Sequence, residues 1–230
     1  MTSPLWAIAG FLGIKTDWDV FDFQNLKSFD LNEFKWENFA DWSQQFNLLA
    51  ASQETKPILM GYSLGARMAL HAFIAKPELW KAGIIISANP GLLSAEERLV
   101  RFENDSKWGE RFLKEEWSSL IHDWNNQAIF KNDLFKFNRY ENNYKRENLH
   151  HVLTRTSLGL QDDLREQITK LSLPILWITG EKDKKCCEIA DSIQLSHPYS
   201  KKIIVSETGH RTAWEQPSLF KKIINDFLLI

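Results

Sequence analysis

Serine, aspartate and histidine residues occur in this chain in an order that suits catalysis by an activated hydroxyl. Ser63 is the centre of a G-x-S-x-G motif at residues 61–65, Asp183 lies far downstream, and His210 follows near the end. A serine hydroxyl is a poor nucleophile or base until an imidazole takes its proton. These residues therefore predict a triad in which Ser63 reacts, His210 accepts its proton and Asp183 orients the imidazole.

The predicted secondary structure brings these three residues to one edge of a sheet. Short apolar runs alternate with helical patterns, which indicates a mostly parallel sheet flanked by helices. The expected strands cover residues 5–9, 20–23, 57–61, 82–87, 175–179 and 202–205, and the expected helices cover 36–51, 64–75, 187–195 and 218–229. Ser63, Asp183 and His210 each follow the carboxyl end of a strand, where open α/β sheets place their sites. The strand-turn-helix context of Ser63 and the chain order Ser, Asp, His predict an α/β-hydrolase fold with a nucleophile elbow.

The middle of the chain lacks the alternation of strands and helices. Residues 90–160 show no strand pattern, whereas 96–114 and 116–126 have the spacing of amphipathic helices. We therefore expect residues 1–90 and 161–230 to form the α/β core and residues 91–160 to form an inserted helical cap.

Other residues compete for the triad roles. Glu181 lies two positions before Asp183 and is the alternative acid, whereas the position after strand 82–87 holds Asn89 and offers none. The remaining histidines fall in helices or polar loops, where surface or packing roles are expected: His71, His122, His150, His151 and His197.

An oxyanion hole needs two backbone N–H donors. One is expected from Leu64, the residue after the nucleophile, and the other from Phe11 in the loop after the first strand. Many proteins of this fold have histidine before the Gly-Phe of this loop, and this chain has Ala9.

Several motifs outside the elbow resemble one family, 2-succinyl-6-hydroxy-2,4-cyclohexadiene-1-carboxylate synthase (MenH) of menaquinone biosynthesis. The matching stretches are residues 61–67, 89–92, 95–101, 108–113, 123–124, 156–161 and 163–165. The resemblance implies a lyase that eliminates pyruvate from 2-succinyl-5-enolpyruvyl-6-hydroxy-3-cyclohexene-1-carboxylate. It also implies that Ser63, deprotonated by His210, is the base, and that the Phe11 and Leu64 amides hold the enolate oxygen.

The resemblance also implies a set of substrate-binding residues. The substrate has three carboxylates, and the arginine fork binds carboxylates through two parallel hydrogen bonds. The expected residues are Tyr62, Arg67, Arg101, Trp124 and Arg139, with Arg146 as the alternative to Arg139. The chain departs from the family at Asn125, where the family has tyrosine, and in the loop after the second strand, so the substrate could differ from the family's.

The composition argues against several other classes of function, such as nucleic-acid binding. Lys plus Arg is 28 and Asp plus Glu is 30, giving a net charge of −2 and none of the basic character of a nucleic-acid binder. The first residues do not resemble a signal peptide and no apolar run is long enough to span a membrane, so we expect a cytoplasmic protein without membrane partners. The only two cysteines, Cys186 and Cys187, are adjacent and lack a metal-binding spacing, and we expect neither metal nor organic cofactor.

Two rival functions fit the same residues. A serine esterase or thioesterase, such as one acting on a pimeloyl-thioester methyl ester, uses the same triad and oxyanion hole. A non-catalytic binding protein of this fold is the other alternative, and the intact triad argues against it. Covalent labelling of Ser63 or turnover of a small ester separates these classes. The sequence does not fix the oligomeric state.

Overall fold

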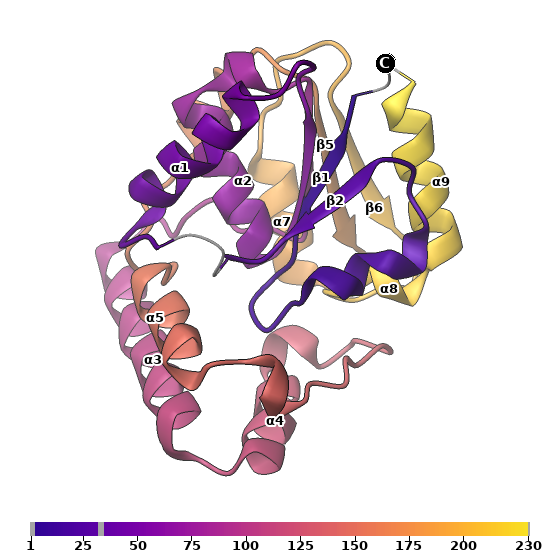
Figure 1. Ribbon diagram of the computed structural model, residues 1–230. Coiled ribbons are helices and arrows are strands. Elements are labelled where there is room, and N and C mark those ends of the chain that lie inside the picture. Colours follow the sequence, from indigo (N-terminus) through magenta and orange to yellow (C-terminus); the bar gives the residue numbers. More distant parts are fainter. Residues whose placement is uncertain (1–2, 32–34, 230) are drawn as a thin grey trace.

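The computed structural model describes residues 3–31 and 35–229, and its centre is a six-stranded sheet (Figure 1). All neighbouring strands pair in parallel, in the order β2-β1-β3-β4-β5-β6. The strands are β1 (Leu5–Ile8), β2 (Leu26–Phe29), β3 (Ile58–Tyr62), β4 (Ala82–Ile86), β5 (Ile175–Gly180) and β6 (Lys201–Val205). The predicted parallel sheet flanked by helices is confirmed.

Helices cover both faces of this sheet (Figure 1). One face carries α1 (Phe39–Ala51), α2 (Leu64–Ala75), α6 (Arg165–Thr169) and α7 (Lys184–Ser192). The other face carries the 3-10 helix η1 (Lys15–Phe21), α8 (Thr212–Glu215) and α9 (Pro217–Leu228). Because both faces are covered, every residue of β3, β4 and β5 is buried, which explains their continuous apolar sequences.

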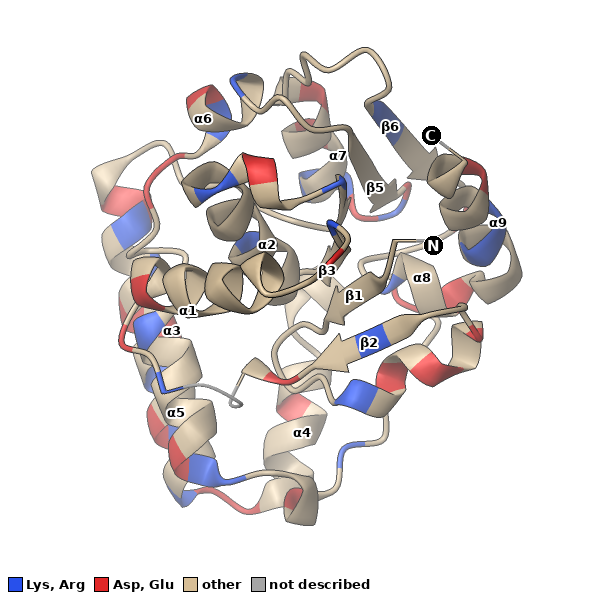
Figure 2. Ribbon diagram, turned by 45° about the horizontal axis from the view of Figure 1, so that its top comes forward, with Lys and Arg blue, Asp and Glu red and all other residues tan. Residues whose placement is uncertain are grey.

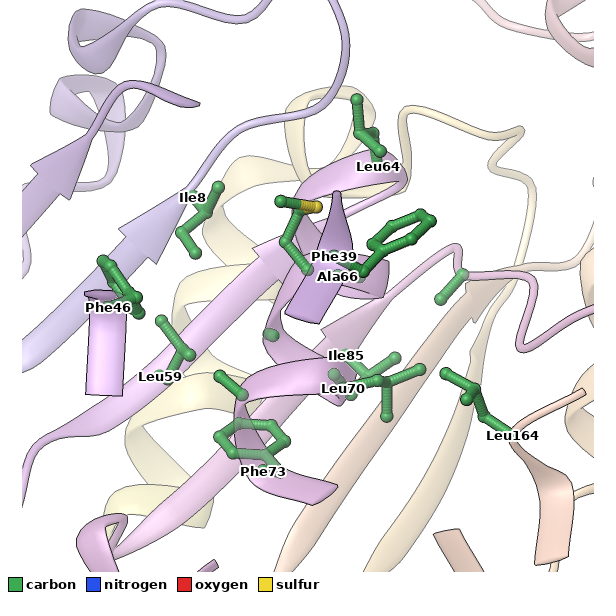
Figure 3. Close-up of a cluster of buried hydrophobic side chains, with 14 of the residues drawn as sticks. Ile8, Phe39, Phe46, Leu59, Leu64, Ala66, Leu70, Phe73, Ile85 and Leu164 are labelled. Carbon is green, nitrogen blue, oxygen red and sulfur yellow. The ribbon is translucent and has the colours of Figure 1, made fainter. Parts of the chain in front are cut away.

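Figure 3 shows how α2 is held on the sheet: Leu70 and Phe73 of α2 lie over Leu59 and Ile85 of the strands. These side chains belong to one buried cluster that also includes Phe46 of α1. Burying a side chain of this size contributes roughly 1.5–3 kcal/mol. The packing fixes the start of α2, and with it the residue that precedes α2, Ser63.

The chain between β4 and β5 forms a layer of helices beside the carboxyl ends of the strands (Figure 1). It contains α3 (Ala95–Lys114), α4 (Trp117–Asn125) and α5 (Arg146–Arg155), together with the short helices η4 (Ala128–Phe130) and η5 (Glu141–Asn143). A further short helix, η3 (Pro77–Leu79), lies between α2 and β4. An aromatic and aliphatic cluster joins these helices to Leu12 of the loop after β1. The division into a core and a cap at residues 91–160 remains a prediction.

The second strand was expected in the wrong place. Residues 20–23 form the end of η1 and a turn, and the strand that pairs with β1 is β2, at Leu26–Phe29. The spacing of two aromatic residues explains this difference. Trp18 and Phe21 are three residues apart, so in a helical turn they lie on the same side, and both pack against Trp214. Val20, between them, is exposed.

Side-chain caps explain two smaller differences in the helix boundaries. α1 begins at Phe39 rather than residue 36 because Asn38 accepts the backbone N–H of Asp41 at 2.9 Å. α7 begins at Lys184 rather than 187 because Asp183 caps it. Helices α5 and α6 were not expected from the sequence.

Charged residues of both signs alternate along the outer helices, including α3 and α5 (Figure 2). Several of them pair one turn apart, such as Lys114 with Glu110 and Arg101 with Asp105. Within the part of the chain that the structure describes, none of the helices combines the length and the apolar character needed to cross a membrane.

Candidate active site

Ser63 occupies a sharp turn between β3 and α2. Its backbone has φ +52° and ψ −111°, a conformation that is costly for a residue with a side chain, and its N–H donates to the Ile86 carbonyl at 2.8 Å. Both motif glycines are required by contacts, because a Cβ on Gly61 would lie 2.4 Å from the Gly65 carbonyl oxygen and one on Gly65 would lie 2.3 Å from that of Ile8. This is the strand-turn-helix geometry of a nucleophile elbow.

The three predicted triad residues meet at the carboxyl edge of the sheet. His210 Nε2 is 3.1 Å from Ser63 Oγ, and His210 Nδ1 is 2.6 Å from Asp183 Oδ2. The imidazole and the carboxylate are both buried, whereas Ser63 is only partly buried. An imidazole so placed can take the hydroxyl proton through Nε2 while Asp183 holds its Nδ1–H.

Asp183 also caps a helix, and this contact fixes the orientation of its carboxylate. It is the N-cap of α7, and its Oδ1 accepts the Cys186 backbone N–H at 3.2 Å, which leaves Oδ2 for the imidazole. Burial alone would raise the pKa of Asp183, but hydrogen bonds from His210 and Cys186 and the charge of His210 hold this pKa below its ordinary value. The carboxylate therefore remains ionised at neutral pH.

The competing residues lie elsewhere. The Glu181 carboxylate accepts the backbone N–H of Glu207 at 2.9 Å. His71 stacks on Phe39, and burial lowers the pKa of His71 to about 4. The other four histidines contact partners outside the triad: His122 with Asn126, His150 with Glu110, His151 with the Trp36 carbonyl and His197 with the Tyr199 N–H.

The loop after β1 forms a tight turn against Ser63. Gly10 accepts the N–H of Gly13 at 2.8 Å, Leu12 has φ +62°, and a Cβ on Gly10 would lie 3.3 Å from the Cβ of Ser63. The Tyr144 hydroxyl donates to the Leu12 carbonyl at 2.7 Å and so braces a loop that has Ala9 in place of histidine. Phe11 belongs to this turn, but its predicted role and that of Leu64 as oxyanion donors remain predictions.

A pocket opens beside Ser63, and its wall is largely aromatic. Phe11, Tyr62 and Trp124 line it together with Phe130 and Phe137. Burial raises the pKa of Tyr62 well above its ordinary value, so the phenol is neutral, and its ring contacts His210 with a centroid distance of 5.5 Å. Of the substrate-binding residues predicted from the sequence, Tyr62, Trp124 and Arg139 thus lie in the pocket with Ser63.

Ligand atoms of Asp183, Cys186 and His210 lie within 4.8 Å of one another, a spacing that a metal ion could use. Metals bind the thiolate of cysteine, and burial raises the pKa of the Cys186 thiol well above its ordinary value. The Asp183 and His210 atoms are already hydrogen-bonded to each other at 2.6 Å. These residues fit a proton-transfer pair better than a metal site.

Comparison with known proteins agrees with this geometry. The family described as "Serine aminopeptidase, S33", an α/β-hydrolase family, matches residues 33–206. A Haemophilus influenzae protein, provisionally named 2-succinyl-6-hydroxy-2,4-cyclohexadiene-1-carboxylate synthase, is 30% identical over 96% of this chain and 95% of its own length. The chain belongs to the α/β-hydrolase superfamily and, within it, to the MenH family. It is therefore an enzyme of α/β-hydrolase type, as the sequence predicted.

A further relative agrees with this placement in the MenH family, and two solved structures share the fold. The synthase of Photorhabdus laumondii is 31% identical over 78% of this chain and 65% of its own length. The structure of MenH from S. aureus superposes with a TM-score of 0.87 at 21% identity, covering all of this chain and 94% of the other. A thermophilic esterase from Thermogutta terrifontis, with malate bound, superposes with a TM-score of 0.73 at 17% identity, covering all of this chain and 90% of the other.

Arg67 of this MenH-family chain turns away from the pocket lining. Its Nε donates to Gln161 Oε1 and its NH2 group to the Thr156 carbonyl, both at 2.8 Å, and its guanidinium lies over Phe39. Burial, reinforced by the nearby charge of Arg101, lowers the pKa of Arg67 to about 9. The spacing of four residues from Ser63 placed Arg67 on the correct helix but did not fix the direction of its long side chain.

The other predicted arginines are paired with acids or backbone groups. Arg101 pairs with Asp105 at 2.9 Å on α3, and neither lines the pocket. Arg139 forms a two-pronged ion pair with Asp17 at 2.7–2.8 Å, with both side chains more than nine-tenths buried. Arg146, the alternative to Arg139, donates to the Phe112 and Glu115 carbonyls. Substrate binding by these arginines remains a prediction.

Sequence reasoning missed Arg211 of this MenH-family chain. It lines the pocket, donates to Asn125 Oδ1 at 2.6 Å and to the Phe135 carbonyl at 3.1 Å, and stacks on Phe130. Its position next to His210 could have drawn attention to it. Asn125, which replaces a family tyrosine, is therefore the hydrogen-bond acceptor for a cation of the pocket.

The triad geometry predicts the effect of two substitutions. Ser63→Ala removes the reactive hydroxyl and His210→Ala removes its base, so each should lower kcat by a factor on the order of 10³ or more. The measurement is turnover of p-nitrophenyl butyrate by purified protein, with circular dichroism to verify folding. A folded variant of either kind that keeps full activity would remove these residues from the catalytic centre.

Proposed function

We propose that this chain is the lyase of menaquinone biosynthesis that eliminates pyruvate from 2-succinyl-5-enolpyruvyl-6-hydroxy-3-cyclohexene-1-carboxylate. The observation that carries the proposal is the hydrogen-bonded line from Asp183 Oδ2 through His210 to Ser63 Oγ, with steps of 2.6 and 3.1 Å, in a chain of the MenH family. The relative from Haemophilus influenzae, provisionally named as this synthase and similar over nearly its whole length, supports it.

The change from a 3-ene to a 2,4-diene defines the bonds that must change. Ser63, relieved of its proton by His210, takes the ring proton at C2, next to the succinyl carbonyl. The C–H electrons form an enolate. As this enolate collapses, a double bond forms between C2 and C3, the C3=C4 bond shifts to C4=C5, and the C5–O bond breaks. The electrons of the C5–O bond leave with the enolate of pyruvate, which takes up a proton and becomes pyruvate. The product keeps the succinyl group and the ring carboxylate.

Each part of this chemistry has a candidate group in the site. The N–H groups of Phe11, in the turn after β1, and of Leu64, at the start of α2, would stabilise the enolate oxygen. The aromatic pocket wall would exclude water from the base, which strengthens its electrostatic interactions. The reaction is redox-neutral and needs no cofactor.

Arg67 does not line the pocket beside Ser63 in this structure, and it is a candidate to bind a substrate carboxylate if its long side chain turns toward that pocket. The hydrogen bonds described for it go to two neutral acceptors, Gln161 Oε1 and the Thr156 carbonyl. A buried charge with neutral partners is costly, and an anionic substrate group nearby would offset that cost. Arg139 is a weaker candidate because Asp17 already neutralises it.

A carboxylic ester or thioester hydrolase is the second candidate. The same Ser63–His210–Asp183 geometry serves acyl transfer. One observation favours a less charged substrate: the pocket arginines Arg139 and Arg211 each have a buried carboxylate nearby, from Asp17 at 2.7 Å and Asp133 at 3.6 Å.

Pyruvate release separates the two candidates. We expect wild-type protein to release pyruvate from the enolpyruvyl substrate, generated in situ, much faster than a sample without enzyme, because the substrate also decays unaided. Ser63→Ala should lower the rate to that of the blank. Release no faster than the blank, from a protein that still hydrolyses p-nitrophenyl butyrate, would refute the lyase and favour the hydrolase.

Substitution of Arg67 tests its role in substrate binding. Arg67→Gln should raise KM for the tricarboxylate substrate at least about tenfold, since a hydrogen bond to a charged group contributes about 1.5–3 kcal/mol. KM for the neutral p-nitrophenyl butyrate should change little. Arg155→Gln, which alters an exposed arginine paired with Glu37, is the control. Equal increases in KM for both substrates would mean that Arg67 only supports the structure.

A further inference from the structure

Both backbone groups of His210, the N–H and the carbonyl, are hydrogen-bonded to side chains. Its N–H donates to Asp133 Oδ1 at 2.6 Å, and its carbonyl accepts the Ser87 hydroxyl at 2.9 Å. Ser87 directly follows β4 and adopts φ +50°. Asp133 comes from the helical chain between β4 and β5, 77 residues before the histidine. The position of the imidazole therefore depends on a carboxylate outside the sheet.

The Asp133 side chain is fully buried and lies directly against Gly209. The exposed fraction of this side chain is 0%, and a Cβ on Gly209 would lie 2.2 Å from Asp133 Oδ1, so only glycine fits before His210. Among the residues that the structure describes, the second carboxylate oxygen has no hydrogen-bond partner, and it lies 3.6 Å from Arg211 Nε. Burial raises the pKa of Asp133 to about 6, against the opposing charges of His210 and Arg211. A fully buried carboxylate is costly to retain unless it is paired or hydrogen-bonded.

The neighbours of Asp133 also contact the loops that carry the triad. We call residues 130–135 the clasp. Asn132 Nδ2 donates to the carbonyl of Lys182, next to Asp183, at 3.1 Å. The Glu215 carboxylate joins the clasp to the histidine loop, because it accepts the N–H of Leu134 at 3.1 Å and that of Gly209 at 2.9 Å.

The clasp also reaches the pocket. The Phe130 ring lies 5.6 Å from the His210 ring, centroid to centroid, and both Phe130 and Arg211 line the pocket beside Ser63. One short segment thus contacts the acid loop, the histidine loop and the pocket wall. Among the hydrogen bonds of the described residues, the one from the His210 N–H to Asp133 Oδ1 is the only one that joins this N–H to the clasp.

We propose that Asp133 is a positioning residue that holds the His210 imidazole in line with Ser63 Oγ. Rotation of the 209–210 peptide would swing the ring about its backbone, and the 3.1 Å Nε2–Oγ distance leaves little room for that movement. A misplacement of about 1 Å in a catalytic group can cost on the order of 10² in rate. The inference rests on the proposed triad and is independent of whether the substrate is the enolpyruvyl compound or an ester.

The test compares two substitutions of Asp133. Asp133→Ala removes the acceptor and should lower kcat for p-nitrophenyl butyrate at least about tenfold, with KM within about twofold. Asp133→Asn keeps an oxygen that can accept the His210 N–H, and its kcat should stay within about threefold of the wild type. Glu141→Ala alters an exposed acid of the same helical chain, paired with Arg146, and should have wild-type kcat. Melting temperatures are measured for all variants, and assays are run well below them.

Three results would overturn the inference. A folded Asp133→Ala with wild-type kcat would show that the hydrogen bond does not position the base. Equal losses of kcat in Asp133→Ala and Asp133→Asn would show that the charge, not the acceptor, matters. If the wild type hydrolyses no ester, the rate at which a fluorophosphonate labels Ser63 replaces kcat, and failure of the wild type to label would leave no base to position. Absence of pyruvate release with normal ester turnover would refute only the lyase assignment.

Discussion

The hydrogen bond between His210 Nδ1 and Asp183 Oδ2, at 2.6 Å, is the contact on which the site depends. It joins the loops after β5 and β6, and it determines which imidazole nitrogen faces Ser63. The neighbouring strands bring these loops together: a Cβ on Gly180 would lie 2.1 Å from the Gly209 carbonyl, and the Lys182 N–H donates to the Thr208 carbonyl at 2.8 Å. The parallel register of the sheet therefore sets the geometry of proton transfer.

The charges around the pocket are mostly balanced inside the protein. Arg139 pairs with Asp17, and Arg211 lies near Asp133. Breaking a buried ion pair by removing one partner leaves an uncompensated charge, so these pairs rigidify the pocket whether or not they touch a substrate. Arg67 differs, because its described hydrogen bonds go to neutral groups. This difference is why it carries the carboxylate-binding proposal.

The sequence predicted the parallel sheet, and it predicted as a group three side chains that the structure places in a hydrogen-bonded line, because both follow from local patterns. An apolar run ending in a glycine turn marks the end of a buried strand, and Ser63, Asp183 and His210 each follow such a run. The strand at 20–23 was wrong because Trp18 and Phe21 pack as a helical turn onto residues near the C-terminus. Long-range partnerships were not predictable: nothing near Asp133 indicates that it would bond the peptide of His210, and nothing near Arg67 indicates a bond to Gln161.

The proposed function depends on activation of the Ser63 hydroxyl by His210, with Asp183 holding the imidazole. The most direct measurement is the rate and site of labelling by a fluorophosphonate, followed by intact-protein mass spectrometry and peptide mapping. We expect one label per chain, on Ser63, with labelling slowed on the order of 10³ in His210→Ala. No label, a label on another residue, or equal rates in the wild type and His210→Ala would contradict it.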